Sequence, residues 1–201
     1  MINILRILKE FKRKTRIIIK EMDCMKVMVP LANGFEEIEA LTIVDVLRRA
    51  GIQTETIGIV GSVIEGSHGV RVMVDKRINE IVPDKFDAII LPGGSPGYKN
   101  LARSNRLMEI LKDFNDKNKL IGAICASPSI LAKQGLLNDK KATIYPGNER
   151  LLAYPRDKPV VVDDNIITSQ GPGTAMEFAL KIVEILLDQH TAQKLRQKLV
   201  A

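Results

Sequence analysis

The sequence predicts a flavodoxin-like, doubly wound α/β domain, with a mostly parallel sheet covered by helices on both faces. The segments expected to form strands are short and apolar on both sides, as in the buried strands of a parallel sheet. They alternate along the chain with amphipathic segments of helical spacing, which is the pattern of repeated strand–helix units. A length of 201 residues with 45% apolar residues suits one domain with a sizeable core.

The first half of the chain opens with a strand over 26–31, which ends at the turn Asn33–Gly34. Helical spacing follows over 36–51, with Arg48 and Arg49 at its C-terminal end. Four further elements are expected in this half: a strand at 53–60, an inserted hairpin at 62–75, a buried strand at 86–94, and a helix at 104–118 capped by Ser104.

The second half repeats the alternation. The expected elements are a strand at 120–125, a helix from Ser127 to about Gln134, a strand at 141–145, a hairpin at 159–169, a closing helix at 171–190 that His190 ends, and a short helical turn at 191–201.

The net charge of +6 is unevenly placed. Residues 1–24 hold seven Lys and Arg against three Asp and Glu, whereas the remaining residues carry 23 basic and 21 acidic side chains. The body of the protein therefore has no single-sign surface field, and its eight aromatic residues are few for base stacking, so the sequence does not favour specific nucleic acid binding.

Residues 1–24 have a basic amphipathic helix pattern, which could lie on a membrane surface or pack on a partner. The favoured interpretation is an extension, either an appendage or the product of a mis-set start codon. No apolar run in the chain approaches the ~20 residues that span a bilayer. Residues 25–190 are expected to form the domain and 191–201 a helical tail. The two cysteines, Cys24 and Cys125, cannot form a disulfide framework, which suits a reducing cytoplasm.

Cofactor binding is not expected. The segment after the first strand, "LANGFEE", holds one glycine and has acids where a pyrophosphate would need amides, so nucleotides, NAD and FAD are disfavoured. No set of residues in the sequence indicates a metal site.

Cys125 stands where a predicted strand turns directly into a helix. A sharp turn there projects the side chain from the sheet edge, and a thiolate at a helix N-terminus is stabilised by the dipole and by free amides. The alternative is a buried structural cysteine, and position alone does not decide between the two.

Glu39 lies on the apolar stripe of the helix at 36–51, with Ile43 and Val46. A carboxyl there is expected to be protonated or hydrogen-bonded, and near Cys125 it could relay a proton. Glu36 and Glu37 are assigned a structural role in the first turn. Further candidates are the amides of Gly93 and Gly94, which with those after Cys125 could hold an oxyanion. Neither His68 nor His190 can be assigned as a base for the thiol.

Five motifs, "LANGFEEIEA", "VDVLRRAG", "LPGG", "AICASP" and "TSQGPGTAMEFALKIVE", together resemble the Parkinsonism-associated deglycase branch of the ThiJ/PfpI superfamily, also classed as peptidase C56-like. The resemblance covers roughly residues 25–190. It implies a class I glutamine amidotransferase-like fold, a homodimer, and a reactive Cys125 on a strained elbow beside a protonated Glu39. By the same resemblance the oxyanion amides fall on Gly93, Gly94 and Ala126.

The chain departs from that family at Tyr145, which replaces a histidine before a proline. A phenol with pKa ~10 is a poor general base at neutral pH but can still position a substrate. Cys125 is followed by Ala126, whereas the protease branch has histidine there, which argues against peptidase activity. His68 falls where the family places a basic residue near the dimer interface; it could hold an anion with Arg49 or belong to a plain surface pair.

Two functions follow from this resemblance. The first is a cofactor-independent enzyme, a deglycase or glyoxalase, that attacks methylglyoxal or glycated side chains through Cys125. The second is a stress protein or chaperone in which Cys125 is oxidised to sulfenate and sulfinate without turnover. A catalytically silent scaffold would require an inaccessible thiol.

Overall fold

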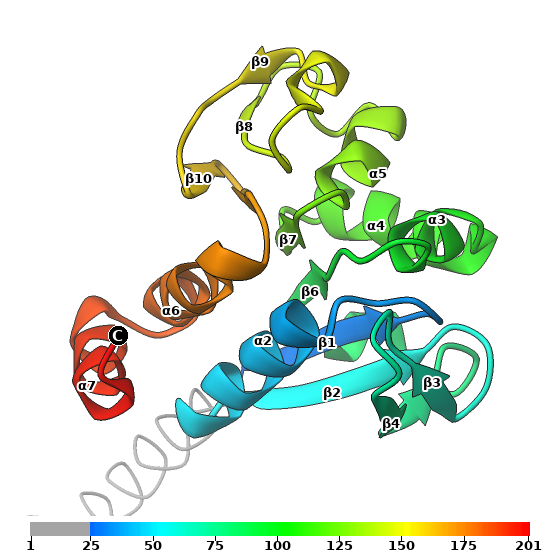
Figure 1. Ribbon diagram of the computed structural model, residues 1–201, viewed down its shortest axis with the longest axis horizontal. Coiled ribbons are helices and arrows are strands. Elements are labelled where there is room, and N and C mark those ends of the chain that lie inside the picture. Colours follow the sequence, from blue (N-terminus) through cyan, green and yellow to red (C-terminus); the bar gives the residue numbers. More distant parts are fainter. Residues whose placement is uncertain (1–24) are drawn as a thin grey trace, which may run out of the picture.

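A computed structural model describes residues 25–201 (Figure 1). The predicted amphipathic helix at 1–24 and Cys24 lie outside the described residues. Within them, no helix is both long and apolar enough to cross a membrane.

The main sheet has seven strands in the order β10-β11-β7-β6-β1-β2-β5, and every neighbouring pair is parallel except β10 with β11. Their bounds are β1 Lys26–Leu31, β2 Gln53–Gly58, β5 Lys76–Arg77, β6 Ala88–Leu91, β7 Leu120–Ile124, β10 Val160–Asp163 and β11 Ile166–Ser169. The strands β2-β1-β6-β7-β11 follow the flavodoxin order 2-1-3-4-5, so the predicted fold is confirmed. The strand order switches between β1 and β6.

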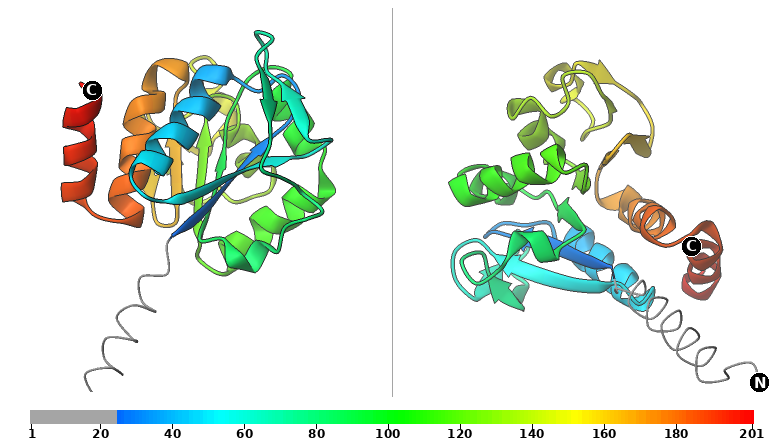
Figure 2. Two further views of the ribbon diagram at one scale, coloured as in Figure 1. Left: turned by 90° about the horizontal axis from the view of Figure 1, so that it is seen from below. Right: turned by 180° about the vertical axis from the view of Figure 1, so that it is seen from behind.

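Helices cover both faces of this sheet (Figures 1 and 2). On one face α2 (Glu37–Arg49) and α6 (Ala175–Leu186) bury Leu47 and Phe178 against the strands. On the other, α3 (Gly97–Ala102), α4 (Asn105–Asp116) and α5 (Pro128–Lys133) pack around Leu111 and Phe114. Ser104 caps α4 as predicted, because its hydroxyl accepts from the Leu107 N–H at 3.2 Å.

The C-terminal region differs from the prediction. The closing helix begins at Ala175 after a 3₁₀ turn, Pro172–Thr174, and ends at Leu186. A separate helix, α7 (Gln189–Leu199), follows where a short turn was expected, and His190 belongs to it. The break occurs because Asp188 caps the new helix, accepting from the Thr191 N–H at 2.8 Å.

The predicted strand at 141–145 is wrong beyond its first two residues. Only β8 (Lys141–Ala142) forms, and it pairs with β9 (Tyr154–Pro155) outside the main sheet. After β8 the main-chain N–H groups no longer bond the main chain of a neighbouring strand. The Thr143 N–H donates to the Thr168 hydroxyl at 2.9 Å, and the Tyr145 N–H donates to the Cys125 carbonyl at 2.8 Å. The segment therefore supports the turn after β7 instead of extending a sheet.

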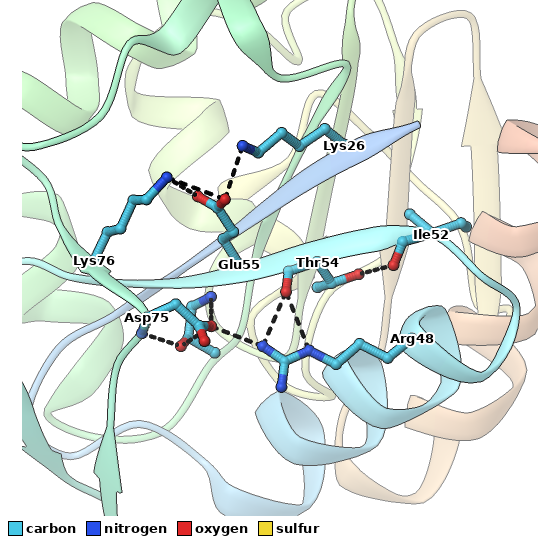
Figure 3. Close-up of polar contacts among 8 residues, drawn as sticks. Lys26, Arg48, Ile52, Thr54, Glu55, Asp75 and Lys76 are labelled. Atoms are coloured by element: carbon cyan, nitrogen blue, oxygen red, sulfur yellow. Dashed lines mark hydrogen bonds and ion pairs between the residues drawn. The ribbon is translucent and has the colours of Figure 1, made fainter. Parts of the chain in front are cut away.

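The predicted hairpin is confirmed as β3 (Val63–Glu65) and β4 (Arg71–Met73). Its base is tied to the end of α2 (Figure 3). Arg48 donates to the Thr54 carbonyl at 2.9 Å and to the Asp75 carboxylate at 2.7 Å. Asp75 also accepts from the N–H and hydroxyl of Thr56. The chain leaving the hairpin is thus held against β2.

A second polar group in Figure 3 joins three parallel strands. The Glu55 carboxylate on β2 lies 2.7 Å from Lys26 Nζ on β1 and 3.1 Å from Lys76 Nζ on β5. Burial raises the pKa of Glu55, but the hydrogen bonds and charges of the two lysines outweigh it, so the pKa lies below its ordinary value. This edge of the sheet is therefore held by charge as well as by main-chain bonds.

Candidate active site

Cys125 follows directly on β7 and has φ of 63°, in the left-handed region that few residues other than glycine adopt. Its main chain is held on both sides: its N–H donates to the Ser169 carbonyl at 3.0 Å, and its carbonyl accepts from the Tyr145 N–H. A strained backbone persists only where neighbours determine it, and such positions cluster at functional sites. Cys125 as a residue is half-buried and packs against the core.

Glu39, in the first turn of α2, is fully buried on the helix face that packs against the sheet. Its Oε2 accepts from the Gly93 N–H at 2.7 Å. Its Oε1 is buried with no well-formed hydrogen bond among the described residues. Burial raises the pKa of Glu39 to about 7, and the nearby charge of Glu36 acts in the same direction, while the Gly93 amide and the Cys125 thiol oppose it.

Gly93 lies between these two side chains. A Cβ added there would stand 2.6 Å from Cys125 Cβ, 3.1 Å from Cys125 Sγ and 2.9 Å from Glu39 Oε2. Any side chain at this position would push the thiol and the carboxyl apart. Gly94 adopts φ of 94°, and a Cβ there would lie 2.3 Å from the Glu36 main-chain nitrogen. Both glycines are therefore required by close approach of backbone and side chains.

The thiol and the carboxyl titrate as a pair. Burial raises the pKa of Cys125 to about 12, with the charge and hydrogen bond of Glu39 adding to it, while the amides of Gly94 and Ala126 oppose the rise. Burial and the neighbouring Glu39 thus act against the lowered thiol pKa that was expected from a helix N-terminus at this position. The pair loses its first proton near pH 7 and its second near pH 12.

The site of the remaining proton follows from hydrogen bonding. The amides of Gly94 and Ala126 bond the sulfur and favour its charged form, whereas Glu39 Oε1 has no well-formed bond and would have a donor to offer if protonated. A protonated Oε1 directed at a thiolate gives both groups a partner. A neutral Glu39 beside a thiolate stays a prediction.

The turn after Cys125 is fixed by a residue that sequence reasoning missed. Ser127 is fully buried, and its hydroxyl donates to the Pro92 carbonyl at 2.6 Å. This bond joins the loop after β7 to the loop after β6, which carries Gly93. The only signal in the sequence is a serine followed by Pro128, which is equally typical of a helix start.

The chain is similar to known proteins over most of its length. Residues 25–185 match the DJ-1/PfpI family. The chain belongs to the DJ-1/PfpI family. It is 40% identical to protein dj-1beta of Drosophila melanogaster over 178 residues, which cover 86% of this chain and 95% of that one.

Two further members of the DJ-1/PfpI family bear on the site. Glutathione-independent glyoxalase DJR-1.2 of Caenorhabditis elegans is 40% identical over 154 residues, 75% of this chain and 82% of the relative. The solved structure of oxidized Toxoplasma gondii DJ-1 superposes with a TM-score of 0.85 at 39% identity, covering 88% of this chain and 98% of that one.

Tyr145 takes the place for which the family resemblance implied a histidine. It lies beside the turn that carries Cys125. Its main chain bonds Cys125, and its half-exposed ring packs near Gly171, where an added Cβ would lie 3.3 Å from the ring. The structure thus brings Cys125, Glu39, Gly93, Gly94, Ala126 and Tyr145 to one edge of the sheet.

His68 lies at the hairpin tip and bonds the first turn of α2. Its main-chain N–H donates to Glu37 Oε1 at 2.7 Å, and its Nδ1 lies 2.9 Å from Glu37 Oε2. Arg49, which was considered with His68 as a possible anion site, pairs with Asp45 at 2.6 Å.

Within residues 25–201, the one group of three potential metal ligands with atoms inside 4.8 Å is Glu36, Glu37 and His68. Both oxygens of Glu37 already accept hydrogen bonds, from His68 and from the Ser67 hydroxyl. Burial opposes ionisation of Glu37, but these bonds outweigh it and lower its pKa to about 2. We therefore interpret the group as a tether between the hairpin and α2.

Proposed function

We propose that this chain is a cofactor-independent enzyme that converts reactive carbonyl compounds, with methylglyoxal as its simplest substrate. The observation that carries the proposal is the pairing of a partly exposed Cys125 with a buried Glu39 whose pKa is about 7. A general acid–base works best when its pKa lies near the working pH. A relative at 40% identity is named a glutathione-independent glyoxalase, which supports the same chemistry.

The reaction begins when the Cys125 sulfur attacks the aldehyde carbon of methylglyoxal. A C–S bond forms, the aldehyde oxygen takes the Glu39 proton, and a hemithioacetal results. The amides of Gly94 and Ala126 bond the sulfur, and during the attack they would also stabilise the developing oxyanion.

The Glu39 carboxylate then removes the proton from the former aldehyde carbon and returns it to the adjacent carbon, while the proton of the hemithioacetal hydroxyl moves to the former ketone oxygen. The first carbon is oxidised and the second reduced, so no external oxidant is needed. Water cleaves the C–S bond of the resulting thioester, releasing lactate and regenerating the thiol. Hydrolysis of an early glycation adduct would use the same nucleophile and the same acid.

The wild-type chain is expected to consume methylglyoxal and form lactate in equal amount. If the residue at position 145 limits proton transfer, Tyr145→His should raise kcat about tenfold or more, within the usual range of general base catalysis. The matched control is Tyr154→His, since Tyr154 is an exposed tyrosine on β9. If neither the wild type nor Tyr145→His forms lactate from methylglyoxal, the proposed enzymatic activity is refuted.

The second candidate is a redox sensor, favoured by the oxidized state of the related Toxoplasma gondii structure. One peroxide would convert the Cys125 thiolate to sulfenate with release of water, and a second would give the sulfinate. A reducing cytoplasm would keep the thiol ready for this reaction.

Mild hydrogen peroxide is then expected to add two oxygen atoms at Cys125 before any methionine is oxidised, measured by peptide mass spectrometry. Cys24 serves as the internal comparison. Oxidation spread evenly over both cysteines would contradict a sensor.

We also propose a homodimer formed through α2 and the hairpin. Exposed apolar side chains gather on these two elements, namely Ile38, Leu41, Val63, Val70 and Met73. The main-chain N–H of His68 in the hairpin donates to Glu37 in the first turn of α2, which supports a joint surface of the two elements. An apolar surface of this kind marks an interface.

Ile38→Asp is expected to convert the dimer to a monomer in sedimentation velocity, because Ile38 is 58% exposed and a charge there would be desolvated. Leu151→Asp, at an exposed position outside both elements, should leave the assembly unchanged. A monomeric wild type would refute the dimer.

A further inference from the structure

A groove between α3 and α5 carries three cations and no acid. It has a volume of about 330 Å³ and is lined by Tyr98, Lys99, Ala102, Arg103, Ser129, Ile130 and Lys133. Lys99 and Arg103 come from α3 and its C-cap, and Lys133 comes from the end of α5, so the charges face the groove from two elements. Figure 1 shows both helices on the same side of the sheet.

The cations of this groove have no carboxylate partner within 4 Å among the described residues. Four other grooves on the described surface each contain a lysine or arginine paired with an acid. The sequence has no Asp or Glu from 88 to 108 or from 117 to 138, the two segments that build the walls.

We propose that this groove binds a small ligand carrying a phosphate or pyrophosphate group. Arginine offers a planar fork of donors to phosphate oxygens, and lysine contributes a mobile point charge. A volume of about 330 Å³ holds a small phosphate ester but is too small to follow a nucleic acid backbone. Tyr98 supplies an apolar face beside the charges.

The groove is connected to the candidate active site through main-chain bonds. The Tyr98 N–H donates to the Gly94 carbonyl at 2.9 Å, and the Ser129 N–H donates to the Ala126 carbonyl at 3.1 Å. The two walls therefore continue the two loops whose amides bond Cys125. The groove itself contains neither Cys125 nor Glu39, so ligand binding there does not depend on the proposed reaction.

Calorimetric titration of the full chain with inorganic pyrophosphate tests the proposal. We expect saturable binding that weakens with added salt. Each of Lys99→Gln, Arg103→Gln and Lys133→Gln should raise the Kd about tenfold, which corresponds to about 1.4 kcal/mol, because each variant loses a charged hydrogen bond to the ligand. Lys194→Gln, an exposed lysine on α7, removes the same charge elsewhere and should leave the Kd unchanged.

Three further arms make the result decisive. Cys125→Ser should bind pyrophosphate like the wild type, which separates this site from the proposed enzyme. Glycerol phosphate binding more tightly than inorganic phosphate would identify a phosphate ester as the ligand, and equal affinities would identify a free oxyanion site. If a variant unfolds, amide NMR shifts of Tyr98 and Ser129 in the wild type replace it. No saturable binding at millimolar pyrophosphate, or an unchanged Kd in all three groove variants, would overturn the proposal.

Discussion

Replacing Cys125 with serine is expected to lower methylglyoxal turnover to the uncatalysed background, a loss of at least about a thousandfold. A hydroxyl in the same position is a far weaker nucleophile, and Glu39 with its pKa of about 7 cannot deprotonate it. The measurement is lactate formation under saturating substrate. Because serine nearly matches cysteine in size, the melting temperature should change little.

The matched control is Cys24→Ser, the other cysteine of the sequence, which precedes the family match at residues 25–185. That variant should retain full turnover. Unchanged consumption in Cys125→Ser would exclude this thiol as the nucleophile, whatever the fold of the chain.

Glu39→Gln is expected to lower turnover by a factor of about 10² to 10⁴, the usual contribution of a general acid–base. Glutamine can still accept the Gly93 N–H bond, so the loop should keep its place. The plot of Cys125 alkylation rate against pH should change as well. The wild-type pair titrates in two steps, near pH 7 and near pH 12, whereas the variant retains only the thiol and should titrate once.

The same substitution predicts a pH-dependent gain in stability. The folded Glu39–Cys125 pair holds both of its protons up to about pH 7, while in the unfolded chain Glu39 releases its proton near the ordinary value of 4.5. Wild-type stability therefore falls as pH rises from 4.5 to about 7, and at about 1.4 kcal/mol per pKa unit the fall is roughly 3 kcal/mol. The free energy of unfolding of Glu39→Gln, relative to wild type, should rise by about that amount between pH 4 and pH 8, measured by urea denaturation. A constant difference across this range would contradict a raised pKa.

Local patterns predicted most of the elements correctly. The alternation of buried strands with amphipathic helices specified the doubly wound fold, and the periodicity of α2 placed Glu39 on the buried stripe with Ile43 and Val46. Ser104 was identifiable as the N-cap of α4 because an N-cap side chain bonds a main-chain N–H only three residues further along the chain. The failures occurred where contacts distant in sequence competed. The segment after Ala142 bonds Thr168 and Cys125 instead of a neighbouring strand, and no local pattern reports such a choice.

The sequence by itself determined which residues would gather, since the carboxyl ends of parallel strands meet at one edge of a sheet and Glu39, Gly93 and Cys125 each follow such a strand. Only the tertiary structure decided their chemistry. The pKa values of Glu39 and Cys125 depend on burial and on the contact between the two groups, and Gly93 is required because Cys125 and the Glu39 carboxyl both lie close to where a Cβ would stand. The acid-free groove between α3 and α5 also arises only on folding, when two basic segments about thirty residues apart become neighbours. The burial of a side chain and the charges around it depend on residues that are distant in the sequence. They therefore cannot be predicted from composition or local periodicity.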